Sequence, residues 1–71
     1  MNFKIRLIQL GKKQADLLDP LRAEGFTITP PELSEIINGR RQTPKAEKVL
    51  DRVDLILSQW EENDDGNNVH I

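Results

Sequence analysis

Two pairs of basic side chains carry the most informative chemistry in this chain. Lys12-Lys13 directly follow one glycine, and Arg40-Arg41 directly follow another. Ammonium and guanidinium groups beside a helix end can neutralise phosphate oxygens. The free amide groups at the start of a helix that follows Lys13 can also hold a phosphate. The two pairs therefore indicate a phosphate-binding surface, although an ordinary solvated surface is also compatible with them.

The chain lacks the residues that most catalytic and metal sites need. Cysteine is absent, the single histidine is His70, and the only serines are Ser34 and Ser58. A catalytic triad cannot be assembled from this set. The acidic run 62–65 before Gly66 lacks the ligand order and the closing glutamate of a calcium loop. We therefore expect no enzyme activity, no metal and no cofactor.

Length and composition describe one small globular domain. The chain has 71 residues, of which 37% are hydrophobic and 31% are charged. Its longest uninterrupted apolar run is Leu55-Ile56-Leu57, which is far too short to cross a membrane. The absence of cysteine suits a reducing compartment. We expect a cytoplasmic protein without a membrane segment.

Charge is distributed unevenly along the chain. Residues 1–45 carry eight basic and five acidic side chains, a net charge of +3, and residues 46–71 carry two basic and seven acidic ones, a net charge of −5. The overall charge of −2 disfavours a nucleic-acid partner by itself. The asymmetry, however, is typical of a nucleic-acid-binding face joined to an acidic tail. Both basic pairs lie in the positive part.

Helices are predicted to position these residues. Apolar side chains recur at helical spacing in residues 2–10, although Ile5-Arg6-Leu7 read alone is compatible with a strand. Residues 13–24 form a second helical segment that contains Pro20. The proline should kink this segment or start a second short helix with Asp19 as its N-cap. Because no partner strand is evident, we expect an all-α fold.

The third segment has the clearest signals for a helix start. Thr29 is a good N-cap, and Pro30 suits the first helical position. Glu32 stands three residues after Thr29, which predicts a capping box. Ile28 and Leu33 occupy the two positions of a hydrophobic staple around the cap. We expect a short, strongly capped helix that ends at Asn38-Gly39.

The fourth segment begins with Thr43-Pro44, again a cap followed by proline. Its apolar stripe predicts a packing helix of four to five turns. We expect Trp60 to lie in the core or in the seam of a dimer, with exposed Leu55 adding to the second idea. Residues 1–62 are predicted to form the domain and residues 63–71 a flexible acidic tail. The stripe consists of Ala46, Val49, Leu50, Val53, Ile56, Leu57 and Trp60.

The second and third segments together suggest a helix-turn-helix. This unit places its second helix in the DNA major groove, with the first residues of that helix toward the base edges. The third segment has the required two faces. Its apolar residues Leu33, Ile36 and Ile37 point one way, and its other face carries Pro31, Ser34, Glu35 and Asn38.

Residues 3–50 resemble the lambdoid phage repressor/Cro family, also called XRE-type regulators. The resemblance lies in Ile8-Gln9-Leu10-Gly11-Lys12-Lys13-Gln14-Ala15-Asp16-Leu17, in Leu33-Ser34-Glu35-Ile36-Ile37-Asn38-Gly39-Arg40-Arg41 and in Pro44. It is most similar to short regulators of phages and other mobile elements. It implies a small four-helix, lambda-repressor-like domain that binds double-stranded DNA as a transcriptional regulator.

The resemblance also implies roles for single residues. Gln14 would contact phosphate and a base, Thr29 and Asn38 would contact the DNA backbone, and the two arginines would clamp phosphates. Three further residues, Pro31, Glu32 and Glu35, occupy positions from which the family often reads bases, although Glu32 is also explained by capping and Glu35 by solvation. The candidate DNA-binding residues are Lys12, Lys13, Gln14, Thr29, Pro31, Glu32, Ser34, Glu35, Asn38, Arg40 and Arg41.

Three departures from the family pattern keep a second interpretation open. The stretch between Gln14 and Thr29 is longer than usual, Pro30-Pro31 supply no side-chain hydrogen bonds, and Glu35 is acidic where amides are common. A carboxylate can accept from cytosine N4, but it repels phosphate. The alternative is a protein-interaction modulator, similar to an antirepressor, that binds a partner regulator and has a lost or weak DNA face.

If the chain is a DNA-binding regulator, we expect a homodimer formed through the fourth helix. The dimer would bind two half-sites about 34 Å apart.

Overall fold

The computed structural model describes the backbone of residues 2–68 and the side chains of residues 2–63. It contains α1 (Phe3–Leu10), a short 3-10 helix η1 (Gln14–Leu17), α2 (Leu18–Ala23), α3 (Pro30–Ile37) and α4 (Pro44–Asn68). Residues 2–68 contain no strand, which confirms the all-α, four-helix prediction. The strand alternative for residues 5–7 is therefore wrong, because Asn2 caps α1 by accepting from the Ile5 amide at 3.3 Å.

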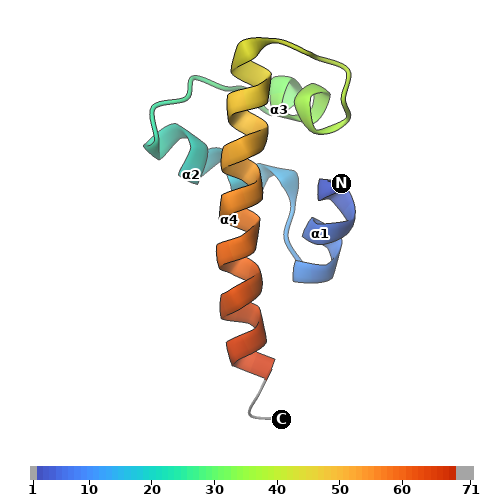
Figure 1. The fold of residues 1–71 in the computed structure, drawn as a ribbon, viewed down its shortest axis with the longest axis vertical. Coiled ribbons are helices and arrows are strands. Elements are labelled where there is room, and N and C mark those ends of the chain that lie inside the picture. Colours follow the sequence, from blue (N-terminus) through green and yellow to red (C-terminus); the bar gives the residue numbers. More distant parts are fainter. Residues whose placement is uncertain (1, 69–71) are drawn as a thin grey trace.

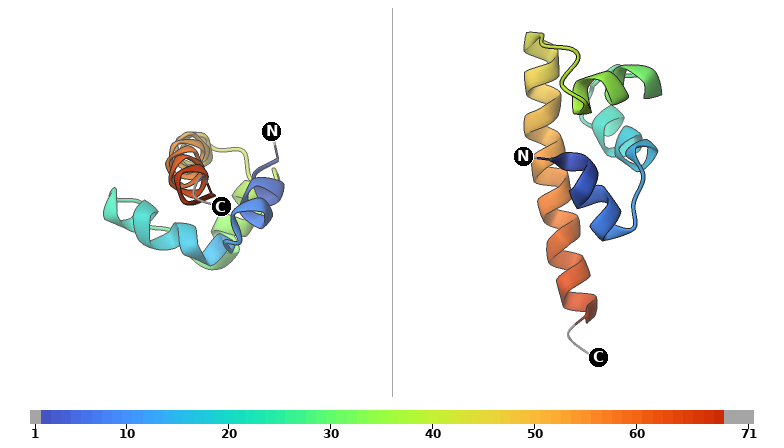
Figure 2. Two further views of the ribbon diagram at one scale, coloured as in Figure 1. Left: turned by 90° about the horizontal axis from the view of Figure 1, so that it is seen from below. Right: turned by 90° about the vertical axis from the view of Figure 1, so that its right-hand side faces the viewer.

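The long helix α4 forms one side of the molecule, and the other elements pack along it. Figure 2 shows α3, the η1–α2 segment and α1 following one another down the same side of α4. The 25 residues of α4 span about 38 Å, which accounts for the elongated shape in Figure 1. The core between them consists of Leu7, Leu17, Leu18, Leu21, Ile28, Leu33, Ile36, Ala46, Val49, Val53, Ile56 and Leu57.

The second segment starts differently from the prediction. Asp19 is not an N-cap, because the chain enters η1 at Gln14 and continues into α2 at Leu18. The backbone amide of Lys13 donates to the Asp16 carboxylate at 2.8 Å, which stabilises the earlier start. Pro20 lies in the first turn of α2, where a helix tolerates a residue without an amide hydrogen.

An ion-pair cluster joins α1 to α4. The Arg6 guanidinium donates to Asp54 at 2.6 Å and to both carboxylate oxygens of Glu61 at 2.8 and 2.9 Å. It also donates to the Ser58 hydroxyl at 3.3 Å. These hydrogen bonds raise the pKa of Arg6 and lower the pKa of Glu61. The cluster therefore fixes α1 against the C-terminal half of α4.

Helix α4 begins as predicted and continues further than predicted. The Thr43 hydroxyl accepts from the Ala46 amide at 3.0 Å, which confirms the cap. The helix continues to Asn68, beyond the four to five turns that the apolar stripe predicts. Trp60 is partly buried and packs against the core. The side chains of residues 64–71 lie outside the described part, so the flexible tail over 63–71 stays a prediction.

None of the helices in the described residues has both the length and the hydropathy that crossing a membrane requires.

Candidate nucleic-acid interface

Helix α3 has one buried and one outward face. The Thr29 hydroxyl accepts from the Glu32 amide at 3.3 Å, and Pro30 occupies the first helical position, so the predicted start is confirmed. Leu33 and Ile36 are each only 1% exposed and hold the helix against the core. Pro31 projects to solvent, and Ser34 and Glu35 are partly exposed on the same outward side. This side is available to a large ligand.

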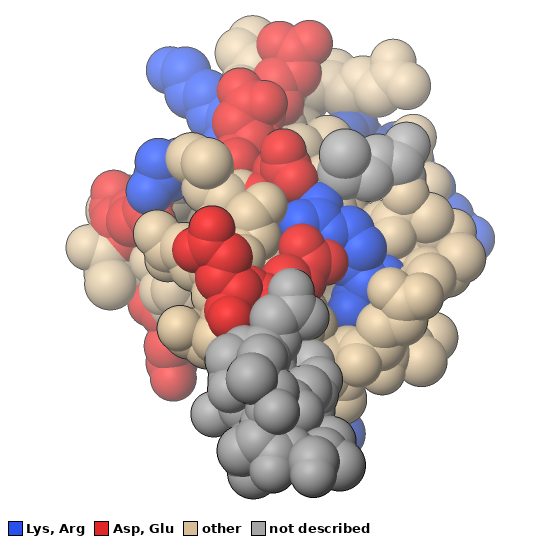
Figure 3. All heavy atoms as spheres, turned by 60° about the horizontal axis from the view of Figure 1, so that its bottom comes forward, with Lys and Arg blue, Asp and Glu red and all other residues tan. Residues whose placement is uncertain are grey.

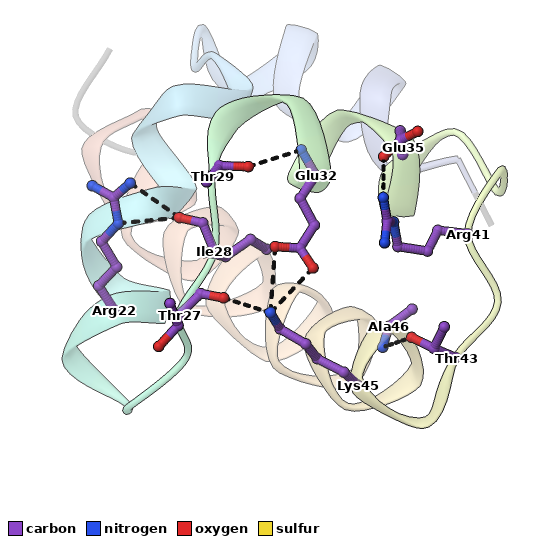
Figure 4. A network of polar contacts seen from close by, with 10 residues as sticks. All are labelled: Arg22, Thr27, Ile28, Thr29, Glu32, Glu35, Arg41, Thr43, Lys45 and Ala46. Atoms are coloured by element: carbon purple, nitrogen blue, oxygen red, sulfur yellow. Dashed lines mark hydrogen bonds and ion pairs between the residues drawn. The ribbon is translucent and has the colours of Figure 1, made fainter.

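The predicted capping box at the start of α3 is only half formed. The Glu32 carboxylate does not turn back to the Thr29 amide, since its oxygens accept from the Lys45 ammonium at 3.1 and 3.3 Å (Figure 4). Lys45 also donates to the Thr27 carbonyl oxygen. A cation therefore competes successfully with a neutral amide for this carboxylate. Glu32 acts here as a link between α3 and α4.

The second acid of α3 is also paired within the chain. Glu35 accepts from Arg41 at 2.6 Å, and both side chains are less than half exposed. This hydrogen bond raises the pKa of Arg41. The guanidinium that the sequence assigns to phosphate binding is thus engaged by a carboxylate of the same surface (Figure 4). A phosphate would have to displace Glu35 to take this guanidinium.

The end of α3 places Arg40 beside the outward face. Gly39 closes the helix with a φ of 76°, a conformation that glycine adopts at little cost. The Arg40 amide then donates to the Glu35 carbonyl at 2.9 Å. The Arg40 side chain is exposed and has no ion-pair partner among the described residues. Nearby, the side-chain amide of Asn38 donates to the Ser34 hydroxyl at 3.2 Å. These two side chains therefore form one hydrogen-bonded pair on the surface.

The three candidate residues around the start of η1 have different surroundings. The Lys12 ammonium stands 5.3 Å from the centre of the Trp60 ring, a cation–π contact that directs it toward α4. Lys13 is exposed at the start of η1, and Gln14 is partly buried. The segment η1 packs against α3, but Gln14 and Lys12 line a shallow hollow with three residues of α1, namely Lys4, Leu7 and Ile8.

Two basic residues that organise this surface were not identified as candidates. Arg22 donates twice to the Ile28 carbonyl, at 3.0 and 3.3 Å, and so fixes the connector that leads into α3 (Figure 4). Lys45 joins the same connector to Glu32. Lys45 lies in the first turn of α4, but no feature of the sequence places that turn against the start of α3.

The charge balance of the surface is modestly positive. The eleven candidates include four basic and two acidic side chains, a net charge of +2. Both acids are neutralised by cations of the same chain, Glu32 by Lys45 and Glu35 by Arg41. Lys13 and Arg40 have no such partner in the described part of the chain.

Among the described residues no group of three or more His, Cys, Asp and Glu side chains is arranged to hold a metal ion. Neither a protein-family model, nor a curated protein, nor a solved structure matches this chain, so its candidate interface rests on its own residues and geometry.

Proposed function

We propose that this chain is a sequence-specific DNA-binding transcriptional regulator of the phage repressor/Cro type. The observation that carries the proposal is the two-faced helix α3. It is capped by Thr29 and anchored by Leu33 and Ile36, and it turns its other side to solvent next to Arg40. A short helix held in this way fits the width of the major groove. In the proposed complex, α3 lies in that groove.

The side chains of this surface then divide into two groups. Arg40 and Lys13 neutralise phosphates on the two sides of the groove and set the affinity. Ser34 and Glu35 face the base edges, and a Glu35 carboxylate released from Arg41 accepts from cytosine N4. Asn38, which is hydrogen-bonded to Ser34, contacts the DNA backbone. Because one short helix contacts few base pairs, the regulator binds as a homodimer on two half-sites.

An electrophoretic mobility-shift series tests the proposal. The DNA is the region upstream of the protein's own gene, and the salt concentration is varied. We expect affinity to fall steeply with salt, and each lost phosphate contact to reduce the slope by about 1. The double variant Arg40→Ala/Arg41→Ala should bind more weakly with a shallower slope. Arg52→Ala is the matched control, because Arg52 pairs with Glu24 on the α2 side of α4.

Absence of binding at low salt, even to bulk DNA, would overturn the proposal. The same result would favour the second candidate, a modulator that binds another regulator protein. One observation supports that candidate. The two acids of α3, Glu32 and Glu35, form ion pairs with Lys45 and Arg41, so these two cations are less available to bind phosphate. For a modulator, the Arg40→Ala/Arg41→Ala variant should bind bulk DNA no differently from the wild type.

A further inference from the structure

The two arginines that follow α3 differ in what holds them. Arg41 donates to the Glu35 carboxylate at 2.6 Å (Figure 4), whereas Arg40 has no ion-pair partner among the described residues. Both arginines are exposed, so both are accessible to a polyanion. Arg40 is thus available to any DNA, and Arg41 becomes available only when Glu35 has been released.

Glu35 is the charged side chain on the outward face of α3. Of the other residues there, Pro31 has no side-chain hydrogen bond to offer, and Ser34 is hydrogen-bonded to Asn38. A serine hydroxyl can donate or accept and so distinguishes little between bases, whereas an ionised carboxylate only accepts. Glu35 is therefore the residue of this face that can select one base most sharply.

A base that takes Glu35 from Arg41 must offer a hydrogen-bond donor. In the major groove, cytosine presents its N4 amino group, guanine presents two acceptors, and thymine presents the acceptor O4. Adenine presents an N6 amino group beside the acceptor N7, which repels a carboxylate. Cytosine is thus the base that attracts Glu35 without an opposing acceptor of its own.

The ion pair between Arg41 and Glu35 is one that DNA can open. Their side chains are 43% and 46% exposed, and exposed ion pairs contribute little to stability. If Arg41 alone moves to a phosphate, the Glu35 carboxylate is left without its cation beside a polyanion. If a cytosine takes Glu35 at the same time, both charges have partners. The two exchanges therefore favour each other.

The distribution of acids makes Glu35 the decisive one at this end of the molecule. Figure 3 looks onto the end where α4 finishes, and acidic side chains gather in the middle and on the left of that view. Helix α3 lies at the other end of α4 (Figure 1). The second acid of α3, Glu32, keeps its pairing with Lys45 when Arg41 leaves. Glu35 is thus the acid of α3 whose charge is uncovered.

We propose that Arg41 is a conditional phosphate contact, and that Glu35 makes this contact depend on the base sequence. On DNA with a cytosine opposite Glu35, the carboxylate accepts from N4 and Arg41 binds a phosphate. On other sequences Glu35 keeps Arg41, and only the unpaired cations bind phosphate. Reading one base therefore adds one phosphate contact. This inference rests on the proposed function and makes Glu35 a residue that determines specificity.

Selection from a library of DNA duplexes with a randomised central stretch tests the base preference. The wild type should enrich cytosine at one position of each half-site. Glu35→Gln should change that position to adenine, because a glutamine amide pairs with both N6 and N7 of adenine. Glu47→Gln, which neutralises an exposed acid on α4, is the matched control and should still select cytosine.

A salt series on two duplexes tests the coupling. One is the selected duplex, and in the other thymine–adenine replaces the cytosine–guanine pair. For the wild type, the plot of log binding constant against log salt concentration should be steeper by about 1 on the selected duplex for each half-site. Arg41→Ala should abolish this difference. Arg40→Ala is the matched control, which should make both slopes shallower and keep the difference.

The outcomes separate this inference from the proposed function. Absence of binding to every duplex at low salt would overturn the proposed function and this inference with it. Binding with equal wild-type slopes on the two duplexes, or a Glu35→Gln variant that still selects cytosine, would overturn the inference alone. Far-UV circular dichroism verifies that each variant is folded.

Discussion

At the scale of single residues, the surface around α3 is controlled by a competition for carboxylates. Glu32 can serve the backbone of its own helix or a cation on the next helix, and the cation holds it. Sequence reasoning identified the cap residue correctly, because an N-cap is a local feature of spacing. It assigned the wrong partner to Glu32, because Lys45 is 13 positions away along the chain and approaches only in the folded state.

The cap itself gives the first prediction. Thr29→Ala removes the hydroxyl that accepts from the Glu32 amide, and it should destabilise the fold by about 1 kcal/mol. In a domain of this size that corresponds to a fall of about 4–8 °C in the melting temperature. Thr27→Ala is the matched control, since Lys45 contacts the backbone carbonyl of Thr27 and not its hydroxyl. Equal melting temperatures for the two variants would show that the cap contributes nothing.

The pairing of Glu35 with Arg41 gives the second prediction. Glu35→Gln frees the guanidinium and removes a negative charge from the outward face, so bulk DNA should bind more tightly at low salt. Arg41→Ala should then reduce binding more in the Glu35→Gln background than in the wild-type background, which a double-mutant cycle measures. Glu47→Gln, an exposed acid on α4, controls for net charge alone. Additive effects would mean that Glu35 does not hold Arg41 away from phosphate.

At the scale of elements, the starts of α3 and α4 were the most predictable features, whereas the start of the second segment and the end of α4 were not. Thr43-Pro44 begins α4 and Gly39 follows the end of α3, because caps and glycine turns depend on neighbouring residues only. The attachment of α1 was not predictable in the same way. Arg6 finds its partners at separations of 48 to 55 residues, and no local pattern indicates which of the many acids on α4 it meets.

The Arg6 cluster predicts an acid-sensitive contact between α1 and α4. The folded state lowers the pKa of Glu61, so this pair stabilises the protein above the ordinary pKa range of glutamate and is lost as pH falls through the lowered pKa. Glu61→Gln should lower the melting temperature at pH 7, and the difference from wild type should shrink in acid. The effect is modest because the Glu61 side chain is 38% exposed.

Glu62→Gln is the control for that measurement. It removes the neighbouring acid, which is exposed and has no ion pair in the described residues. Its melting temperature should follow that of the wild type at every pH. A Glu61→Gln curve that runs parallel to the wild type down to low pH would contradict the lowered pKa.

At the scale of the whole molecule, the positive and negative side chains are concentrated on different helices. The positive part, residues 1–45, contains α1 to α3 and the candidate interface, and the negative part is almost entirely α4 with the end of the chain. Among the described side chains, Leu57 is the last in the core, Trp60 the last that packs against it, and Glu61 the last of α4 that contacts α1. The domain boundary predicted at residue 62 stays a prediction, because the described side chains end at residue 63.

Removal of residues 63–71 tests that boundary. The shortened chain should keep a cooperative thermal transition close to that of the full chain, because the core and the Glu61 contact are retained. Loss of Asp64 and Asp65 changes the net charge from −2 to 0, so bulk DNA should bind more tightly at low salt. The full-length variant Asp64→Asn/Asp65→Asn separates charge from length and should show the same gain in binding. A shortened chain that melts without a cooperative transition would place residues 63–71 within the folded unit, and α4 beyond Glu61 would then contribute to stability.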